Sequence, residues 1–262
     1  MSGEAISSNG SRSALLLYNQ SRGRALLELC VGYALILLVI WTPRPWQRLL
    51  YIAALAWILL ATYLSFNSRK ATLLRPSRSA RSLWIIAAAL LVAGIAVVFA
   101  FRLQTLHLPH GAAFFIRSFW GYALWSLVQQ FLLQCFFLLR LLRILLSQRN
   151  AVITAVCLFG IAHIPNPILT TLTLIWGSIA CLLFLRYRNL YTLGVVHAIF
   201  GITLAITVPG SISRNMRVGL GYLRYPSRHH HLHLSQSDHT VSTLACVTAA
   251  APTRRSVRHA LP

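Results

Sequence analysis

The sequence predicts an all-α membrane protein, a polytopic bundle of about seven or eight transmembrane helices. Three observations predict this fold class. Of the 262 residues, 57% are hydrophobic and only 10% are charged, whereas a soluble domain carries about a quarter charged residues. The apolar residues are gathered in long runs, as in chains that cross a bilayer. Most cations fall in the short gaps between these runs, where membrane proteins place their loops.

Seven apolar runs are expected to form helices, separated by prolines or by polar and cationic gaps. The fourth run lies within 111–142 and is too long for one span. We therefore expect 112–119 to be an interfacial entry and 120–139 to be the membrane part. The predicted helices cover 25–41, 48–66, 82–101, 120–139, 152–164, 168–185 and 191–208.

These runs divide the chain into three segments. A polar N-terminal segment (1–24) precedes the membrane domain (25–208), and a basic C-terminal segment (209–262) follows it. Residues 226–262 are expected to be disordered, because they are rich in Ser, His, Arg and small residues. A histidine tract in this tail could bind a metal, but we interpret it as part of a solvated low-complexity segment. The tract consists of His229, His230, His231 and His233.

The net charge of +21 does not indicate nucleic-acid binding, because the cations occupy gaps between membrane runs. Connections on one side of the membrane would hold thirteen Lys and Arg residues, Arg140 among them, and those on the other side four. This bias predicts a cytoplasmic N-terminus, in the inner membrane if the protein is bacterial. Seven spans would place the basic stretch 214–228 outside, so either a span is missing or this stretch lies on the membrane.

Glu28 is the only carboxylate in a predicted span, within the first turn or so of the first helix. A functional interpretation has its side chain reaching into the bundle to pair with a histidine. We favour a structural interpretation, in which it lies near the interface and complements the helix N-terminus.

Three groups of polar residues lie at membrane depth, where polar side chains cost free energy and often mark a site. Gln129, Gln130 and Gln134 lie in the fourth run, and the last two share a helix face. His163 ends the fifth run, and His197 lies well inside the seventh. The amides could form an interhelical clamp, and either histidine could be a satisfied core residue. Together the histidines could hold one water molecule or one metal ion.

The second half of the chain, roughly residues 118–208, resembles the CPBP family of intramembrane endopeptidases, also called the CAAX-protease and Abi family. Members carry three helical motifs in order, Glu-Glu-x-x-x-Arg, Phe-x-x-x-His and His-x-x-x-Asn. The Ala-His-x-Pro-Asn-Pro stretch at 162–167 also matches. The corresponding residues here are Gln129-Gln130-x-x-x-Gln134, Phe159-x-x-x-His163 and His197-x-x-x-Gly201.

The resemblance implies an endopeptidase that hydrolyses a peptide bond near the membrane surface. His163 and His197 would be catalytic, and the three glutamines would orient the water. The partners implied are membrane lipid and a peptide or protein substrate, which could be lipidated, and no nucleic acid. The resemblance leaves open whether a divalent metal such as zinc, bound by His163 and His197, takes part.

The chain departs from the family motifs at the residues that carry the chemistry. Gln130 stands where the family has the Glu that activates water, and an amide cannot accept a proton at useful pH. Gln134 and Gly201 replace the Arg and the Asn. A catalytically inactive member that acts as a membrane scaffold or binding protein is therefore the alternative. A transporter is disfavoured, because no inverted repeat or pair of broken helices is apparent.

Overall fold

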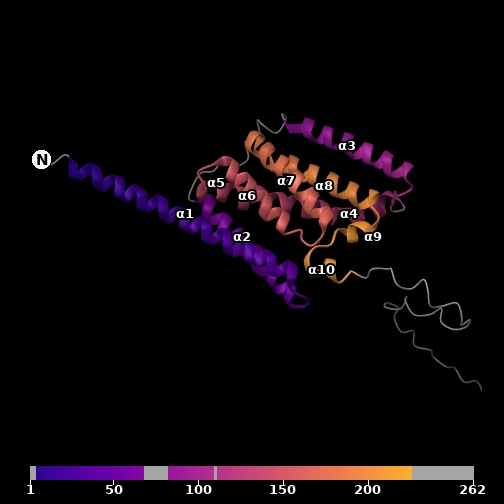
Figure 1. Cartoon of the computed structure of the whole chain (residues 1–262), viewed down its shortest axis with the longest axis horizontal. Helices are drawn as coiled ribbons and strands as arrows, with labels where there is room; N and C mark the ends of the chain where they lie inside the picture. The colour runs from indigo at the N-terminus through magenta and orange to yellow at the C-terminus, as the bar shows by residue number, and fades with distance from the viewer. Residues whose placement is uncertain (1–3, 68–81, 109–110, 226–262) are drawn as a thin grey trace, which may run out of the picture. The chain divides into compact units, whose positions relative to one another are not determined.

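The computed structural model describes residues 4–67, 82–108 and 111–225, and no strand occurs among them. The fold is an all-α polytopic helix bundle, as predicted (Figure 1). Six helices of the described part are long and apolar enough to cross a membrane, which indicates an integral membrane protein. The main helices are α1 (Glu4–Trp41), α2 (Trp46–Asn67), α3 (Leu83–Arg102), α4 (Ala112–Phe131), α5 (Leu139–Ile144), α6 (Gln148–Ile161), α7 (Pro167–Tyr187) and α8 (Leu190–Thr207).

Each of the seven predicted runs forms a helix. The fourth run is one continuous helical path, because a π-helix, η3 (Leu132–Leu138), joins α4 to α5. The fifth run forms α6, which has only 14 residues and is therefore roughly 21 Å long. This length is below the roughly 30 Å of a bilayer core, so α6 is an apolar helix shorter than the six candidate spans.

The first helix begins earlier than the hydropathy of the sequence suggests. It starts at Glu4 rather than at residue 25, and its membrane-compatible part begins at Ser21. Glu28 therefore lies in the middle of a long helix, and the expectation that it complements a helix N-terminus is wrong. Its carboxylate must be stabilised by side chains of neighbouring residues instead.

Hydrogen bonds between distant residues define the two ends of the bundle. At the near end, the Arg22 guanidinium donates to the carbonyl oxygen of Ile144, and the Asn189 amide donates to the Ser82 hydroxyl. At the far end, the backbone N–H of Gly219 donates to Ile164, and that of His107 to Ile206. Successive helices thus run in alternating directions, α6 included (Figure 1).

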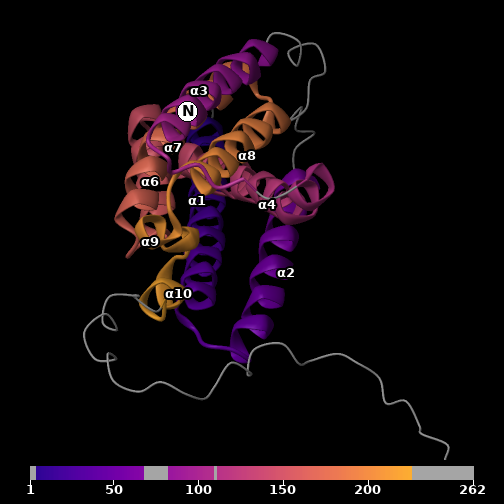
Figure 2. The same ribbon diagram turned by 90° about the vertical axis from the view of Figure 1, so that its right-hand side faces the viewer.

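The helical path from α4 through η3 to α5 forms the centre of the bundle. Half of its span is buried, against 17% for the span of α3. Within η3, six of seven side chains are buried, at positions 133–138. They pack against residues of α1, α6 and α7 in the main hydrophobic core. Figure 2 shows α3 beside α8. Helix α3 makes few contacts with α1 and α2, so most of its side chains are left to contact lipid.

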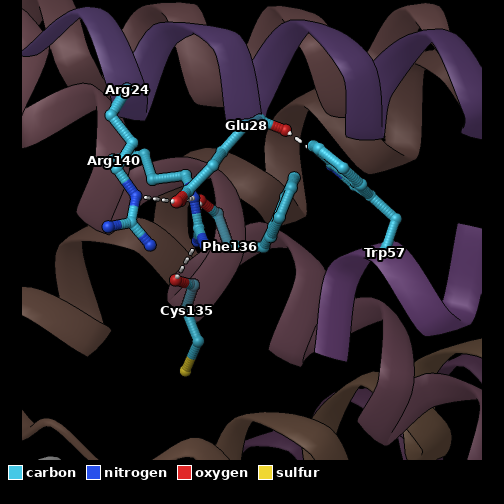
Figure 3. Close-up of polar contacts among 6 residues, drawn as sticks. All are labelled: Arg24, Glu28, Trp57, Cys135, Phe136 and Arg140. Carbon is cyan, nitrogen blue, oxygen red and sulfur yellow. Dashed lines mark hydrogen bonds and ion pairs between the residues drawn. The ribbon is translucent and has the colours of Figure 1, made fainter. Parts of the chain in front are cut away.

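A buried ion pair joins α1 to this central path (Figure 3). The Glu28 carboxylate accepts from Arg140 Nε at 3.1 Å and from Arg24 Nε at 2.9 Å. Arg140 is only 2% exposed. The charge count assumes that Arg140 lies in an aqueous connection, and this assumption is wrong. The backbone carbonyl of Glu28 also accepts from the indole N–H of Trp57 on α2. Glu28 thus ties together α1, α2 and α5.

Arg140 also satisfies the backbone of the π-helix. Its Nη1 donates to the carbonyl oxygens of Cys135 and Phe136, at 3.4 and 3.1 Å, and its guanidinium lies over the Phe136 ring. That ring packs against Gly32 of α1, where a Cβ atom would overlap it. Helix α1 therefore packs against η3 through two adjacent contacts, the Glu28–Arg140 ion pair and the packing of Phe136 on Gly32.

Side-chain caps fix three of the helix starts. Ser147 accepts the backbone N–H of Asn150 at the start of α6, and Asn189 accepts that of Thr192 at the start of α8. Asn166 accepts the N–H of Leu169 at the start of α7, and Pro167 occupies the first turn. These residues are strong N-caps because their oxygens satisfy an otherwise unpaired helical N–H.

The basic segment after α8 is not a missed span. It forms three short helices, α9 (Gly210–Ser213), η4 (Arg214–Met216) and α10 (Gly219–Leu223), none long enough to cross a membrane. The buried Asn166 amide donates to the carbonyl oxygens of Ser213 and Arg217, which fastens this segment to the α6–α7 turn. The predicted disordered tail 226–262, with its histidine tract, lies outside the described residues.

We predict that Glu28→Ala will destabilise the protein by about 3–5 kcal/mol, because Arg140 would be left as a buried charge without its counterion. Thermal unfolding in detergent measures this. Arg24→Ala is the matched control, because the Arg24 side chain is 53% exposed and an exposed pair contributes about 0–1 kcal/mol. The double variant Glu28→Leu, Arg140→Met should be less destabilised than Glu28→Ala. Equal losses for Glu28→Ala and Arg24→Ala would contradict the role of the pair.

Candidate functional site

A chain of buried hydrogen bonds crosses from the central path to α8. The Gln134 Nε2 donates to Gln130 Oε1 at 3.2 Å, and Gln130 Nε2 lies 2.9 Å from His197 Nδ1. Gln130 and Gln134 are fully buried, and His197 is 6% exposed. The predicted shared face of the two glutamines is confirmed by their mutual hydrogen bond. The bond between Gln130 and His197 joins α4 to α8, as expected if the amides form an interhelical clamp.

His163 lies in the turn that follows α6, at the far end of the bundle. Its Nδ1 is 2.7 Å from the carbonyl oxygen of Phe159. The Phe159 ring lies edge-on to both imidazoles, with centroid distances of 4.8 Å to His163 and 6.2 Å to His197. The structure thus brings the two predicted histidines together around one aromatic ring.

The hydrogen-bond partners assign opposite roles to the two rings. A carbonyl oxygen only accepts, so His163 Nδ1 carries the proton and Nε2 keeps its lone pair. With the Gln130 oxygen placed toward Gln134, its amide N–H donates to His197 Nδ1, and this placement puts the proton of His197 on Nε2. In the neutral pair, His163 Nε2 is a base and His197 Nε2–H is a donor.

Both histidines line a cavity of about 560 Å³. Its wall is mainly apolar and comes from α1, α2, α4, α6, α7, α8 and the segment after α8. No Asp or Glu among the described residues lines it. A volume of this size is typical of a ligand site. Its polar or ionisable lining includes Tyr33, Tyr51, Tyr122, Gln129, His163 and His197.

The three glutamines occupy different places. Gln129 lines the cavity, whereas Gln130 and Gln134 are fully buried and do not. Consecutive residues of a helix project about 100° apart, so Gln129 and Gln130 cannot share one role. Gln129 is placed to contact a ligand directly, whereas Gln130 contacts His197 and Gln134 contacts Gln130.

Close packing of α4 on α8 depends on two glycines. A Cβ atom at Gly194 would overlap the Leu127 side chain, and one at Gly201 would overlap the ring and hydroxyl of Tyr122. The sequence interpretation treated Gly201 only as a lost asparagine and did not consider Tyr122. The seven-residue spacing of the two glycines, which puts small residues on one helix face, is the signal that could have located this contact.

The resemblance leaves open whether a divalent metal such as zinc takes part, with His163 and His197 as its ligands. Catalytic zinc sites supply three protein ligands. Within the described residues, no group of three His, Cys, Asp or Glu side chains is close enough to hold a metal. Each histidine has its Nδ1 in a hydrogen bond, as metal-binding histidines commonly do. His163 and His197 would therefore supply two of the three protein ligands that a catalytic zinc site uses.

Comparisons with known proteins do not assign this chain to a family. No family model matches it, and no curated protein or solved structure matches it either. A function must therefore be argued from the geometry of the cavity and from the three motifs.

We predict that Gln130→Leu will lower stability by about 2 kcal/mol or more, because it removes the buried partner of both Gln134 and His197. Gln129→Leu is the matched control, one residue away. It changes the same chemical group at a position that lines the cavity, and it should stay within about 0.5 kcal/mol of the wild type. Thermal unfolding of both variants in one detergent makes the comparison. A larger loss for Gln129→Leu would show that the amide chain is not a structural contact.

Proposed function

We propose that this protein is an intramembrane endopeptidase of the CPBP type. One observation carries the proposal. Two neutral imidazoles with opposite tautomers line a single cavity, so that one offers a lone pair and the other an N–H. Hydrolysis of an amide needs both, a base for the water and a donor for the carbonyl oxygen.

In the proposed reaction, His163 Nε2 removes a proton from a water molecule as its oxygen attacks the carbonyl carbon of the scissile peptide bond. The carbonyl π electrons move to oxygen, and His197 Nε2–H donates to the oxyanion. When the tetrahedral intermediate collapses, the C–N bond breaks and the imidazolium of His163 gives its proton to the leaving nitrogen. The products are a carboxylic acid, which then ionises, and an amine, and no other reactant is needed.

The buried glutamines have a positioning role in this mechanism. Gln130 holds His197 in the tautomer that donates from Nε2, and Gln134 fixes the orientation of the Gln130 amide. Gln129, which lines the cavity, is available to hydrogen-bond the water or the peptide. The substrate is a peptide segment entering from the bilayer, because an apolar cavity favours an apolar ligand.

We further propose that the near end of the bundle faces the cytoplasm. The N-terminal segment and the connections at that end carry twelve Lys and Arg residues without Arg140, against four in the far-end connections. The basic segment after α8 is interpreted as lying on the membrane at the far end. The α6–α7 turn with His163 is at the far end, beside the segment after α8. Cleavage would then occur close to the surface opposite the cytoplasm.

A membrane binding protein without hydrolytic activity is the second candidate. It is favoured by the absence of Asp and Glu from the cavity lining within the described residues. In this alternative the cavity binds an apolar peptide or lipid, and the amide chain is a structural clamp. The two candidates differ in whether a bond is broken when the cavity is occupied.

For a protease, we predict that His163→Ala will reduce kcat at least about a hundredfold, because the general base is lost. The measurement is cleavage of a peptide library by the purified protein in lipid vesicles, with and without a chelator. His107→Ala is the matched control, because His107 is an exposed histidine of the connection after α3. Equal activity of the two variants would exclude His163 as the base, and loss of activity with the chelator would require a metal.

We predict that Gln130→Glu will raise the rate of hydrolysis about tenfold or more. A carboxylate at this position would stabilise a protonated His197 by accepting from its Nδ1–H, and Nε2–H would remain as a charged, stronger donor to the oxyanion. Gln129→Glu, which adds the same charge one residue away, controls for electrostatics. If Gln130→Glu folds normally and does not raise the rate of hydrolysis, the result favours the binding protein. In a binding protein, substitutions in the cavity would change only the affinity for the partner.

A further inference from the structure

The face of α8 that carries His197 also carries two glycines. Gly194, His197 and Gly201 are three and four residues apart, so they form one stripe on the helix. This stripe faces α4, because His197 bonds to Gln130 and the two glycines pack against Leu127 and Tyr122. Gly201 is one helical turn from His197. The phenol of Tyr122 on α4 fills the space that a side chain at position 201 would occupy.

That phenol belongs to the cavity. Tyr122 lines the same cavity as His163 and His197. On α4 it is eight residues before Gln130, two turns away on the same face. The α4 face that positions His197 through Gln130 thus also brings a hydroxyl group to the α8 stripe. A phenol O–H is a good hydrogen-bond donor and is neutral at physiological pH.

We propose that Tyr122 is a catalytic residue, whose hydroxyl donates a hydrogen bond to the carbonyl oxygen of the scissile peptide bond as negative charge develops there. This inference rests on the proposed hydrolysis. It supplies a second donor beside His197 Nε2–H, and two donors are the usual complement of an oxyanion site. No new reactant is required, because Tyr122 keeps its proton throughout.

The packing also explains why α8 does not supply this donor itself. Any side chain at position 201 would overlap the Tyr122 ring and hydroxyl. A donor can therefore come from residue 122 or from residue 201, but not from both at once. In this proposal Tyr122 and Gly201 act as a unit, because the glycine leaves the space in which the phenol lies against α8.

The first test compares Tyr122→Phe with the wild type in the vesicle cleavage assay. Loss of one oxyanion donor should lower kcat about 10²–10³-fold and leave KM within about threefold, because the ground-state carbonyl is bound more weakly than the oxyanion. Tyr63→Phe is the matched control, because Tyr63 is an exposed tyrosine of α2 that does not line the cavity, and it should keep wild-type kcat. Identical kcat values for the two variants would overturn the proposal.

A rescue separates a donor from a packing residue. Gly201→Asn alone should be inactive, because Tyr122 occupies the space of the new side chain. Combined with Tyr122→Ala, which empties that space, Gly201→Asn supplies an amide donor from the other helix. Recovery of kcat to at least tenfold above Tyr122→Ala supports the proposal. No recovery, in a double variant whose thermal unfolding matches that of Tyr122→Ala, contradicts it.

Binding of a peptidyl phosphonate distinguishes failure of this inference from failure of the proposed function. Its anionic oxygens imitate the tetrahedral intermediate, and the same peptide with an intact amide is the neutral reference. Tyr122→Phe should weaken phosphonate binding about tenfold or more and leave binding of the amide unchanged. If the wild type does not cleave peptides but this selective loss is seen, the role of Tyr122 as a donor is supported and the proposed hydrolysis is overturned. If the wild type neither cleaves nor binds phosphonate, both are overturned.

Discussion

The buried pair between Glu28 and Arg140 is the contact on which the rest of the bundle depends. An uncompensated charge at this depth would be expensive, so each residue fixes the position of the other. Arg140 in turn satisfies two carbonyl groups of η3 and covers the Phe136 ring. The π-helix, which alters the register of the central path, is thus stabilised at its end by a side chain from α5 and a carboxylate from α1.

The π-helix also determines how Gln130 and Gln134 are placed at its N-terminal end. The π-helix begins directly after Phe131, so Gln134 lies inside it and Gln130 just before it. π-Helical turns are rare and occur often at functional sites. Here the altered turn accompanies the hydrogen bond from Gln134 to Gln130, and that bond orients the amide that contacts His197. The π-helix thus contributes both to the packing of the bundle and to the hydrogen bonds that hold His197.

The amides beside His197 determine how the two imidazoles would share the proposed chemistry. A carboxylate beside His197 would accept a proton or orient the ring through Nδ1–H. Gln130 instead donates to Nδ1 and makes Nε2 a donor. His163, whose Nδ1–H is held by the Phe159 carbonyl, is left with the free lone pair. Two chemically identical side chains would thus have different roles in the proposed reaction, because their backbone and amide partners differ.

The sequence by itself determined the membrane class, the seven helical runs and the shared face of Gln130 and Gln134, because hydropathy and helical periodicity are local properties. It also singled out His163 and His197, since polar residues are rare at membrane depth. Only the tertiary structure decided that Glu28 pairs with Arg140, that the fourth run contains a π-helix, and that Tyr122 fills the space beside Gly201. These depend on contacts between residues up to 112 positions apart, and local periodicity carries no information about which helices are neighbours.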